Sequence, residues 1–156
     1  MGDPPSPPLD RFIRAQAPVF EQVLAELRAG RKRTHWMWFV FPQIRGLGHS
    51  PTAQHYALDS LEEAEAYLRH PLLGERLRQC TRLVRDIDGR AIGEIFPDPD
   101  QLKFHSCMTL FARAAGHRTP PPEDQIFRGA LEKYFGGQED PRTLERLLRD
   151  PIPDGR

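Results

Sequence analysis

The chain has 156 residues, a length that fits one domain and leaves no room for two substantial ones. Leu, Ile, Val and Phe supply 37 of them, which is enough for a single hydrophobic core. Basic and acidic residues number 22 each, so the formal net charge is zero, which argues against a general polyanion-binding protein. No apolar run reaches the roughly 18 residues that a membrane-spanning helix needs.

Cysteine use and the N-terminal segment predict a cytoplasmic protein. The N-terminus, MGDPPSPPLD, has neither the basic nor the apolar region of a secretory signal. Cys80 and Cys107 form no CxxC motif and stand among apolar or helical residues, so we expect buried thiols. Proline clusters predict a disordered tail over residues 1–9, one helical domain over 10–150 and a loose tail over 151–156.

The first half of the chain predicts short amphipathic helices separated by residues that end helices. Asp10 can cap a first helix, which is able to bend or restart at Pro18 and ends at Gly30. A serine followed by proline at 50–51 is a typical helix start. The capping-box sequence SLEE at 60–63 predicts another short helix.

The second half continues this pattern. Apolar residues recur at spacings of three and four over 71–88, and 91–96 predicts a single turn of helix. Further helices are expected over 100–115, over 123–135 and after 140. No segment alternates apolar and polar residues, and valine occurs only four times. The sequence therefore predicts an all-α fold, a compact single-domain array of six to eight short helices.

Residues 31–50, RKRTHWMWFVFPQIRGLGHS, differ from these helical segments. Both tryptophans of the chain, Trp36 and Trp38, lie here in an uninterrupted apolar run. Two interpretations compete. In the first, the rings fill the core, and His35 or Gln43 accepts the hydrogen bond of a buried indole N–H. In the second, the rings form the wall of a ligand pocket.

In the pocket interpretation, the residues after the rings form the floor. Gly46 and Gly48 let a ligand approach the backbone closely. The helix start at Ser50 would favour an anion such as phosphate, because its first amide groups have no partner within the helix. The two interpretations are compatible with each other.

The same segment carries a family resemblance. The string HWMWFVFPQIRGLGHS, followed by EAEAYLRHPLLGERL and then DQLKFHSCMTLFA, resembles a widespread bacterial family catalogued as domain of unknown function 1810. The resemblance covers roughly residues 10–148. It implies a mainly helical single domain and brings no established reaction.

A second likeness is to small helical proteins that act on ADP-ribose and related N-glycosides. It rests on the order of a ring-rich segment, a helix with Tyr56, a Met-containing helix and a KYF stretch. Those enzymes resemble one another in a glutamate just before an aromatic pair. This chain has Gln54 and His55 before Tyr56 and no carboxylate, so the likeness assigns no catalytic acid.

The segment DQLKFHSCMTLF predicts a helix that carries further polar candidates. Lys103 and Ser106 lie along one strip, and with Thr109 they could bind phosphate or ribose hydroxyls. Ser106 and Thr109 could instead bond to the carbonyl group four residues earlier in their own helix. Asp100 is a candidate base, although its place at a helix start also suits a cap.

His35 is a candidate acid or base near neutral pH, or else a structural hydrogen-bonding residue. The six histidines show neither HExxH nor HxH spacing, and the two cysteines form no CxxC motif, so the sequence predicts no metal site and no cofactor. His35, Ser106 and Asp100 are the catalytic candidates, and none of them is assigned.

Three functions remain open at this point. The first is binding or hydrolysis of a nucleotide-like N-glycoside related to ADP-ribose or NAD; if the protein is an enzyme, it is a glycosidase-type hydrolase. The second is a non-catalytic ligand-binding or protein-interaction module whose rings are core. The third is nucleic-acid binding through the basic run Arg28–Arg33. The predicted ligand site comprises Trp36, Trp38, Gln43, Gly46, Gly48, Ser50, Tyr56, Lys103, Ser106 and Thr109.

Overall fold

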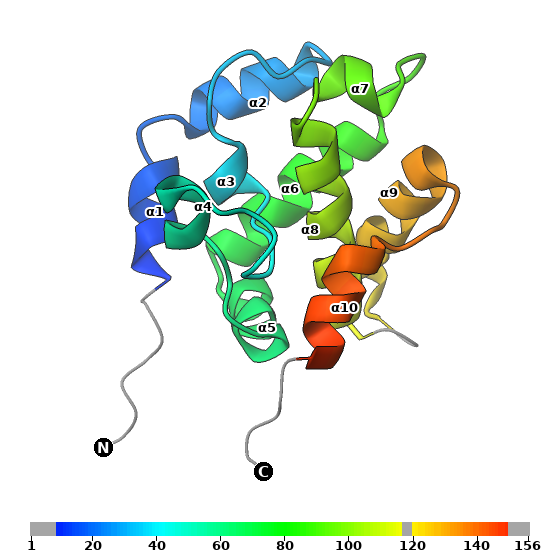
Figure 1. The fold of residues 1–156 in the computed structure, drawn as a ribbon. Coiled ribbons are helices and arrows are strands. Elements are labelled where there is room, and N and C mark those ends of the chain that lie inside the picture. The colour runs from blue at the N-terminus through cyan, green and yellow to red at the C-terminus, as the bar shows by residue number, and fades with distance from the viewer. Residues whose placement is uncertain (1–8, 117–119, 150–156) are drawn as a thin grey trace.

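A computed structural model describes residues 9–116 and 120–149 of the chain. Within these ranges the chain forms ten α-helices and one short 3-10 helix, with no strand (Figure 1). The predicted all-α class is confirmed, although six to eight helices were expected. The additional helices arise because the chain breaks at Pro18 and because α3 (Met37–Val40) forms one helical turn inside the aromatic run. Apart from Leu9, the tails predicted over 1–9 and 151–156 lie outside the described ranges.

The remaining helices agree with the predicted segments to within a few residues. They are α1 (Asp10–Gln16), α2 (Phe20–Arg28), α4 (Pro51–His55), α5 (Leu61–Arg69), α6 (Leu73–Arg85), α7 (Ile92–Ile95), α8 (Asp100–Ala114), η1 (Pro122–Asp124), α9 (Gln125–Phe135) and α10 (Pro141–Arg149). Two predicted caps are present: Ser50 Oγ accepts from the Ala53 N–H, and Ser60 Oγ accepts from the Glu63 N–H, each at 3.1 Å. The cap expected at Asp100 is absent, because Pro99 occupies the cap position of α8.

Helix α8 runs through the middle of the molecule, and α3, α5, α7, α9 and α10 pack against it (Figure 1). Every residue from Ser106 to Ala112 is buried, so this part of α8 is enclosed on all sides. A helix with this burial is a core helix. Its buried hydroxyl groups therefore need partners inside the protein.

The aromatic segment contributes two of its four rings, Trp36 and Phe41, to the core. Trp36 is 1 % exposed, and its ring centroid lies 6.2 Å from that of Phe41 and 6.4 Å from that of Phe96. Phe41 in turn packs edge-on against Phe104 of α8 at 5.1 Å. The core interpretation of the segment therefore holds for these rings, whereas Trp38 is only half-buried.

The two cysteines are buried, as the sequence predicts. Burial raises the pKa of the Cys80 thiol to about 12 and raises the pKa of the Cys107 thiol well above its usual value. Both side chains therefore stay protonated and act as small apolar groups. In the described part of the chain, none of the helices has the length and apolar character needed to cross a membrane.

Candidate functional site

A buried carboxylate shapes the chain that leads into the aromatic run. Glu26, in the last turn of α2, is 3 % exposed. Its oxygens accept hydrogen bonds from the backbone N–H groups of Arg33 and Thr34, from the Thr34 hydroxyl and from the Trp36 indole, at 2.6 to 3.1 Å. The loop after α2 therefore folds around Glu26. Trp36 finds its buried partner here, and not at His35 or Gln43 as expected.

These hydrogen bonds determine the charge state of Glu26. Burial by itself raises the pKa of the carboxyl group, but the donors from Thr34, Arg33 and Gln22 outweigh it and lower the pKa to about 2. Glu26 is therefore ionised at neutral pH. Its negative charge lies under a loop whose side chains are mainly basic.

An open cleft of about 640 Å³ lies between this loop, the turn at residues 97–99 and the first turn of α8. This volume is typical of small-molecule sites. Its apolar lining consists of Met37, Trp38, Pro97 and Pro99. Trp38 is half-buried and shows part of its ring to the cleft, whereas Trp36 lies in the core. The structure thus separates the two indoles, and the expectation that both line one pocket is corrected for Trp36.

The charged lining of the cleft is predominantly basic. The cationic residues are Arg31, Lys32, Arg33 and Lys103, His35 lies beside them, and the carboxylates are Asp98 and Asp100. Four positive charges facing two negative ones give the cleft a formal charge of +2 with His35 neutral, although the whole chain is neutral. Opposite charge concentrated in a cleft raises the local concentration of an anionic ligand.

Two lysines from distant parts of the chain meet at Asp100. Lys32 Nζ lies 2.8 Å from one carboxylate oxygen, and Lys103 Nζ lies 3.5 Å from the other. Lys103 Nζ also stands 5.0 Å from the centre of the Trp38 ring, a cation–π distance. The structure therefore brings together Trp38 and Lys103, two residues of the predicted ligand site. Asp100 is held by two cations, so it is not placed as a free base.

The two arginines at the rim have no such partner. Arg31 and Arg33 are exposed, and no carboxylate among the described residues pairs with either guanidinium group. Only the backbone N–H of Arg33 is engaged, by Glu26. His35 is also exposed, and no hydrogen bond to its ring is found within the described ranges. The structural bond expected for His35 is therefore not seen, and its imidazole faces the cleft as a solvent-accessible group.

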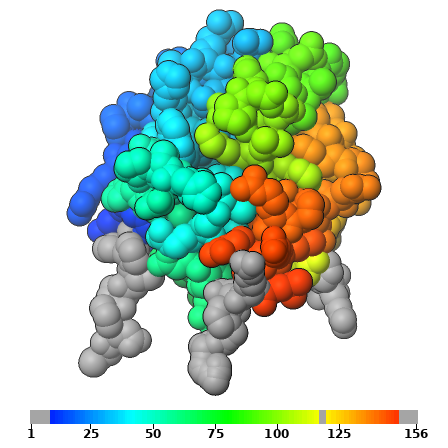
Figure 2. Space-filling view, viewed as in Figure 1, coloured from blue at the N-terminus to red at the C-terminus, as the bar shows by residue number. Residues whose placement is uncertain are grey.

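The glycine loop expected to form the floor of the pocket is not part of this cleft. Residues 45–47 instead lie against α10, where Arg146 Nε donates to the Arg45 carbonyl at 3.1 Å and Arg142 donates to the Leu47 carbonyl at 3.1 Å (Figure 2). Gly46 has φ +105°, and a Cβ there would lie 2.5 Å from Arg146 Nε. Glycine at this position therefore makes room for the Arg146 side chain and not for a ligand.

Four other predicted residues near this loop also lie away from the cleft. Gly48 packs closely on Ala53, and Ser50 caps α4. Tyr56 is half-buried against Phe12 and Phe39, at ring distances of 5.8 and 5.3 Å. The Gln43 carbonyl accepts from the Leu58 N–H, and a parallel bridge pairs the neighbouring Ile44 with Leu58. These residues hold the connection between α3 and α5 together.

Ser106 and Thr109 serve to dock α10. Asp140 Oδ2 accepts from Ser106 Oγ at 3.1 Å and from the Thr143 N–H and hydroxyl at 3.1 and 2.6 Å. Thr109 Oγ1 accepts from the Asp140 N–H at 2.9 Å and donates to the His105 carbonyl in its own helix. Both hydroxyls are therefore satisfied inside the protein. This corrects their expected role as phosphate or ribose ligands.

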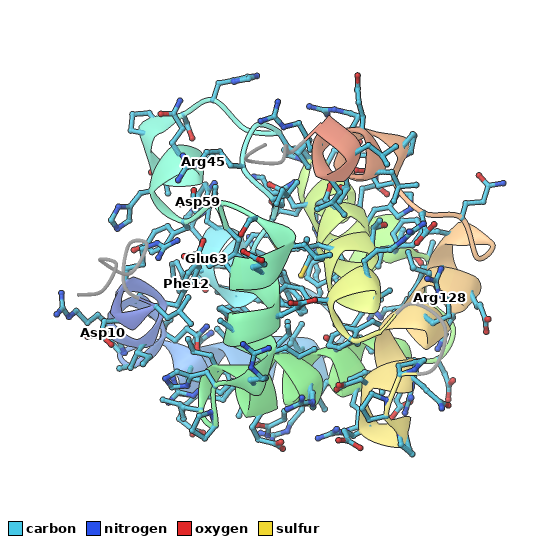
Figure 3. The ribbon with its side chains drawn as sticks, turned by 90° about the horizontal axis from the view of Figure 1, so that it is seen from below. Asp10, Phe12, Arg45, Asp59, Glu63 and Arg128 are labelled. Carbon is cyan, nitrogen blue, oxygen red and sulfur yellow. The ribbon has the colours of Figure 1, made fainter. Side chains whose placement is uncertain are left out.

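A second group of charges lies between α1, α4 and α5. Asp59, Glu63 and Arg45 stand close together near the start of α5 (Figure 3). Arg45 pairs with Asp59, and one Glu63 oxygen accepts from the Asp59 N–H at 2.7 Å. Arg11 donates to the carbonyl groups of His55 and Ala57 at 2.8 and 2.9 Å. The group joins α1, α4 and α5 through polar contacts, most of which are partly buried.

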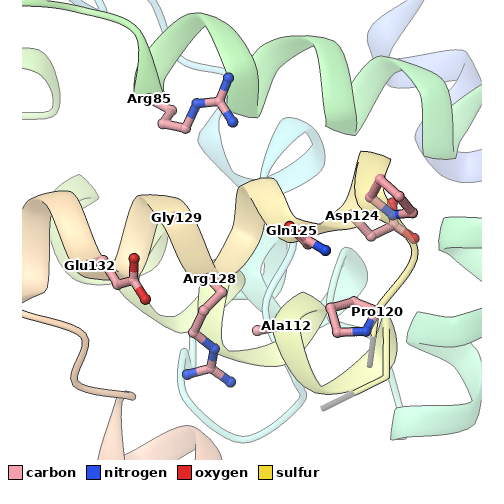
Figure 4. Close-up of a pocket in the computed structure, with 9 residues that line it drawn as sticks. Arg85, Ala112, Pro120, Asp124, Gln125, Arg128, Gly129 and Glu132 are labelled. Atoms are coloured by element: carbon pink, nitrogen blue, oxygen red, sulfur yellow. The ribbon is translucent and has the colours of Figure 1, made fainter. Parts of the chain in front are cut away.

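A second cavity, of about 530 Å³, lies between α6, α8 and α9 (Figure 4). Its lining includes Arg85, Gln125, Arg128 and Glu132. Arg128 pairs with Glu139 at 3.2 Å, and the lining contains no aromatic ring. The cleft lined by Trp38, here called the Trp38 cleft, has both a ring and two arginines that pair with no carboxylate of the described residues, so it is the better candidate for a ligand site. No group of three or more His, Cys, Asp or Glu in the described ranges is placed to hold a metal ion.

Two features of this region are not predicted from the sequence. One is the place of Lys32 in the cleft lining, since the residue is predicted only as part of a basic run. The other is the role of Glu26, which is not in the lining but holds the loop that is. A glutamate on the apolar face of α2, next to Leu27 and three residues after Val23, was the available signal. No sequence pattern predicts that the turn at residues 97–99 lines the cleft, because the position of this turn depends on how α7 and α8 pack.

The comparisons with known proteins name neither a ligand nor a reaction. Over residues 6–147 the sequence matches the family described as "Protein of unknown function (DUF1810)". The fold is similar to the crystal structure of the conserved hypothetical protein Rv1873 from Mycobacterium tuberculosis, with a TM-score of 0.84 and 58 % identity over 90 % of this chain and 96 % of that one. No curated protein matches. The likeness to ADP-ribose-processing proteins finds no support among these matches.

Proposed function

Because the chain belongs to the DUF1810 family of proteins of unknown function, its chemistry has to be inferred from its own residues, and we propose that the Trp38 cleft binds a nucleotide-like anion. The observation that carries this proposal is the placement of a partly exposed indole in one cleft with Lys103, whose Nζ lies 5.0 Å from the ring centre, and with Arg31 and Arg33, which no carboxylate of the described residues pairs with. A ligand of this class has a flat ring, which stacks on an indole, and a phosphate, which pairs with lysine and arginine. ADP-ribose and NAD are the natural probes.

The charge distribution supports an anionic ligand. Arg31 and Arg33, from the loop after α2, and Lys103, from α8, line the same cleft as Trp38. Guanidinium groups bind phosphate oxygens in pairs, because their donors match the geometry of the anion. A neutral ligand would leave these cations unused, and a cationic one would be repelled.

Binding is better supported than hydrolysis. Cleavage of an N-glycoside is commonly assisted by a carboxyl group that can give or take a proton. Asp100 is paired with two lysines, and Asp98 accepts a hydrogen bond from the Gln101 side chain. His35 is the remaining candidate for an acid or base in the lining of the cleft. We therefore propose a binding site first, with hydrolysis through His35 as a separate claim.

Tryptophan fluorescence tests the binding proposal directly, because the two indoles differ in environment. ADP-ribose should quench Trp38 and leave the buried Trp36 nearly unchanged. The wild-type protein should therefore show a partial loss of emission, and a Trp38→Phe variant should show none. A rise in melting temperature should accompany binding, since a ligand at 100 times its Kd stabilises the native state by about 2.7 kcal/mol.

Matched charge variants complete the test. Arg31→Ala combined with Arg33→Ala should weaken ADP-ribose binding by about tenfold or more, as expected for the loss of two charge-assisted contacts. Arg14→Ala, at an exposed position on α1, is the control and should have no effect. If the melting temperature stays unchanged when ADP-ribose, NAD or their nucleotide fragments are added, the proposal is wrong and the protein-interaction module is favoured.

The enzymatic claim and the nucleic-acid alternative have their own readouts. Release of a free base from an N-glycoside, lost in His35→Gln without loss of fold, would establish a hydrolase. Salt-sensitive binding of single-stranded oligonucleotides, stronger than binding of ADP-ribose, would favour nucleic-acid binding through Arg28–Arg33.

A further inference from the structure

Lysine is rare in this chain, and most of the lysines lie in the same cleft. Of its 22 basic residues only three are lysines, and two of these three, Lys32 and Lys103, meet at the single carboxylate of Asp100 in the Trp38 cleft. The third, Lys133, donates to the carbonyl groups of Arg85 and Ile87. One carboxylate cannot neutralise two ammonium groups. The Asp100 site therefore keeps a net positive charge.

The two lysines at Asp100 are not equivalent. Lys32 has a side chain that is 8 % exposed, with its Nζ 2.8 Å from Asp100 and 5.4 Å from the centre of the buried Trp36 ring. A cation this deeply buried needs its counter-charge, because desolvation without a partner is costly. The Lys32–Asp100 pair is therefore a fixed part of the structure.

Lys103 is held more loosely. Its side chain is 21 % exposed, and its 3.5 Å distance to Asp100 exceeds the 2.7–2.9 Å usual for a charge-assisted hydrogen bond. The longer distance makes this the weaker of the two contacts with Asp100, so Lys103 can change partner more readily than Lys32 can. Its place beside Trp38 puts it where the phosphate of a stacked ligand would arrive.

We infer that Asp100 is a placeholder anion, which holds Lys103 beside Trp38 until a phosphate binds and then releases Lys103 to the phosphate while it keeps Lys32. This inference rests on the proposed function. It makes Asp100 a positioning residue and Lys103 the specificity-determining cation of the site. A phosphate is preferred over a neutral ligand because only an anion can replace the Asp100 contact.

Methyl labelling of lysine tests, in the wild-type protein, whether Lys103 leaves Asp100 for a phosphate. Reductive methylation with carbon-13 formaldehyde gives signals for only three lysines and the N-terminal amine. Addition of inorganic phosphate, or of ADP-ribose, should shift the Lys103 signal and leave those of Lys32 and Lys133 in place. A shift of Lys32 with Lys103 unmoved, or no shift of any lysine with either probe, would overturn the inference.

A double-variant cycle measures the coupling between the two residues. Asp100→Asn should tighten ADP-ribose binding by about fivefold, as expected for one released charge pair, and leave adenosine binding unchanged. In a Lys103→Met background the same change should have less than a twofold effect. A gain that persists in full without Lys103 would show that Asp100 acts only as a general negative charge. Lys133→Met is the matched lysine control.

The outcomes separate this inference from the proposed function. If inorganic phosphate shifts the Lys103 signal but no nucleotide binds, the placeholder role stands and the nucleotide proposal fails. If ADP-ribose binds and quenches Trp38 while Lys103 stays on Asp100, the proposed function stands and the placeholder role fails. The labelling experiment uses the wild-type chain, so it decides the question even if Asp100→Asn destabilises the protein.

Discussion

The carboxylate of Glu26 accepts five hydrogen bonds, four of them from residues 33–36. A single side chain therefore determines how the loop after α2 turns. Its effect reaches the candidate site, because the same loop carries Arg31, Arg33 and His35 to the cleft. The position of three site residues thus depends on a fourth that does not touch the ligand space.

Replacement of Glu26 tests this role. Glu26→Gln removes the charge and turns an amide NH₂ toward groups that are themselves donors, so we expect a loss of about 3 kcal/mol in unfolding free energy. Chemical denaturation measures it. Glu21→Gln makes the same chemical change at an exposed position of α2 and should cost less than 0.5 kcal/mol. Equal stability of the two variants would contradict the role given to Glu26.

The depressed pKa of Glu26 also predicts a pH dependence. The group has a pKa of about 2 in the folded protein against 4.5 when exposed, so the folded state favours its ionised form. The stabilisation, about 3 kcal/mol for this shift, is fully present above pH 4.5 and is lost as the pH falls toward 2. Unfolding measured against pH should show a gap between wild type and Glu26→Gln that closes over this range. A gap of constant size would contradict the prediction.

At the scale of elements, α10 is attached by polar contacts at both of its ends. Asp140 joins its start to Ser106 of α8, while Arg142 and Arg146 hold the loop at residues 45–47. Leu148 on the same helix is 86 % exposed. The attachment therefore depends on specific hydrogen bonds as well as on apolar burial.

The start of α10 should be sensitive to the loss of its cap. Asp140→Ala removes the acceptor for Thr143 and Ser106, and we expect a cost of about 1–2 kcal/mol. Asp140→Asn retains a capping side chain and should cost clearly less. Thermal unfolding measures both. Because Asp140 lies outside the cleft, neither variant should change the affinity for ADP-ribose, and a change would mean that α10 contributes to the site.

The loop at Gly46 offers a matched pair of glycine substitutions. Gly46→Ala places a Cβ against Arg146 at a φ of +105°, whereas Gly137→Ala meets nothing closer than 3.9 Å at a φ of +79°. Backbone strain of about 1–2 kcal/mol applies to both variants. Gly46→Ala should therefore destabilise the protein more than Gly137→Ala does, because it also displaces Arg146 from the Arg45 carbonyl. Equal melting temperatures for the two variants would show that this arginine contact contributes nothing.

At the scale of the whole molecule, the charge is balanced but not evenly distributed. The chain is neutral overall, while the Trp38 cleft carries a formal charge of +2. Attraction of an anion is therefore local and should not extend to long polyanions. This distribution favours a small ligand over a nucleic acid.

Ionic strength tests that distribution. The Kd for ADP-ribose should rise as sodium chloride increases, since salt screens exposed cations such as Arg31 and Arg33. The Kd for adenosine should change little. Titrations at low and at physiological salt provide the comparison, and equal salt dependence for the two ligands would contradict an electrostatic role for the cleft.

The sequence alone determined the all-α class, the helix end at Gly30 and the caps at Ser50 and Ser60. These features are local: each depends on a spacing or a cap within a few residues. The sequence also predicts Trp38 and Lys103 as residues of a ligand site, and the structure places both in the lining of one cleft.

Only the tertiary structure decided which polar and aromatic residues face a ligand space. Trp36 and Trp38 are two residues apart, yet one bonds to Glu26 in the core and the other lines the cleft. Ser106 and Thr109 share a helix with Lys103, yet they hold α10. The physical reason is that burial and partner choice depend on segments that are distant in the sequence, such as α2, α8 and α10, and no local pattern records how these pack together.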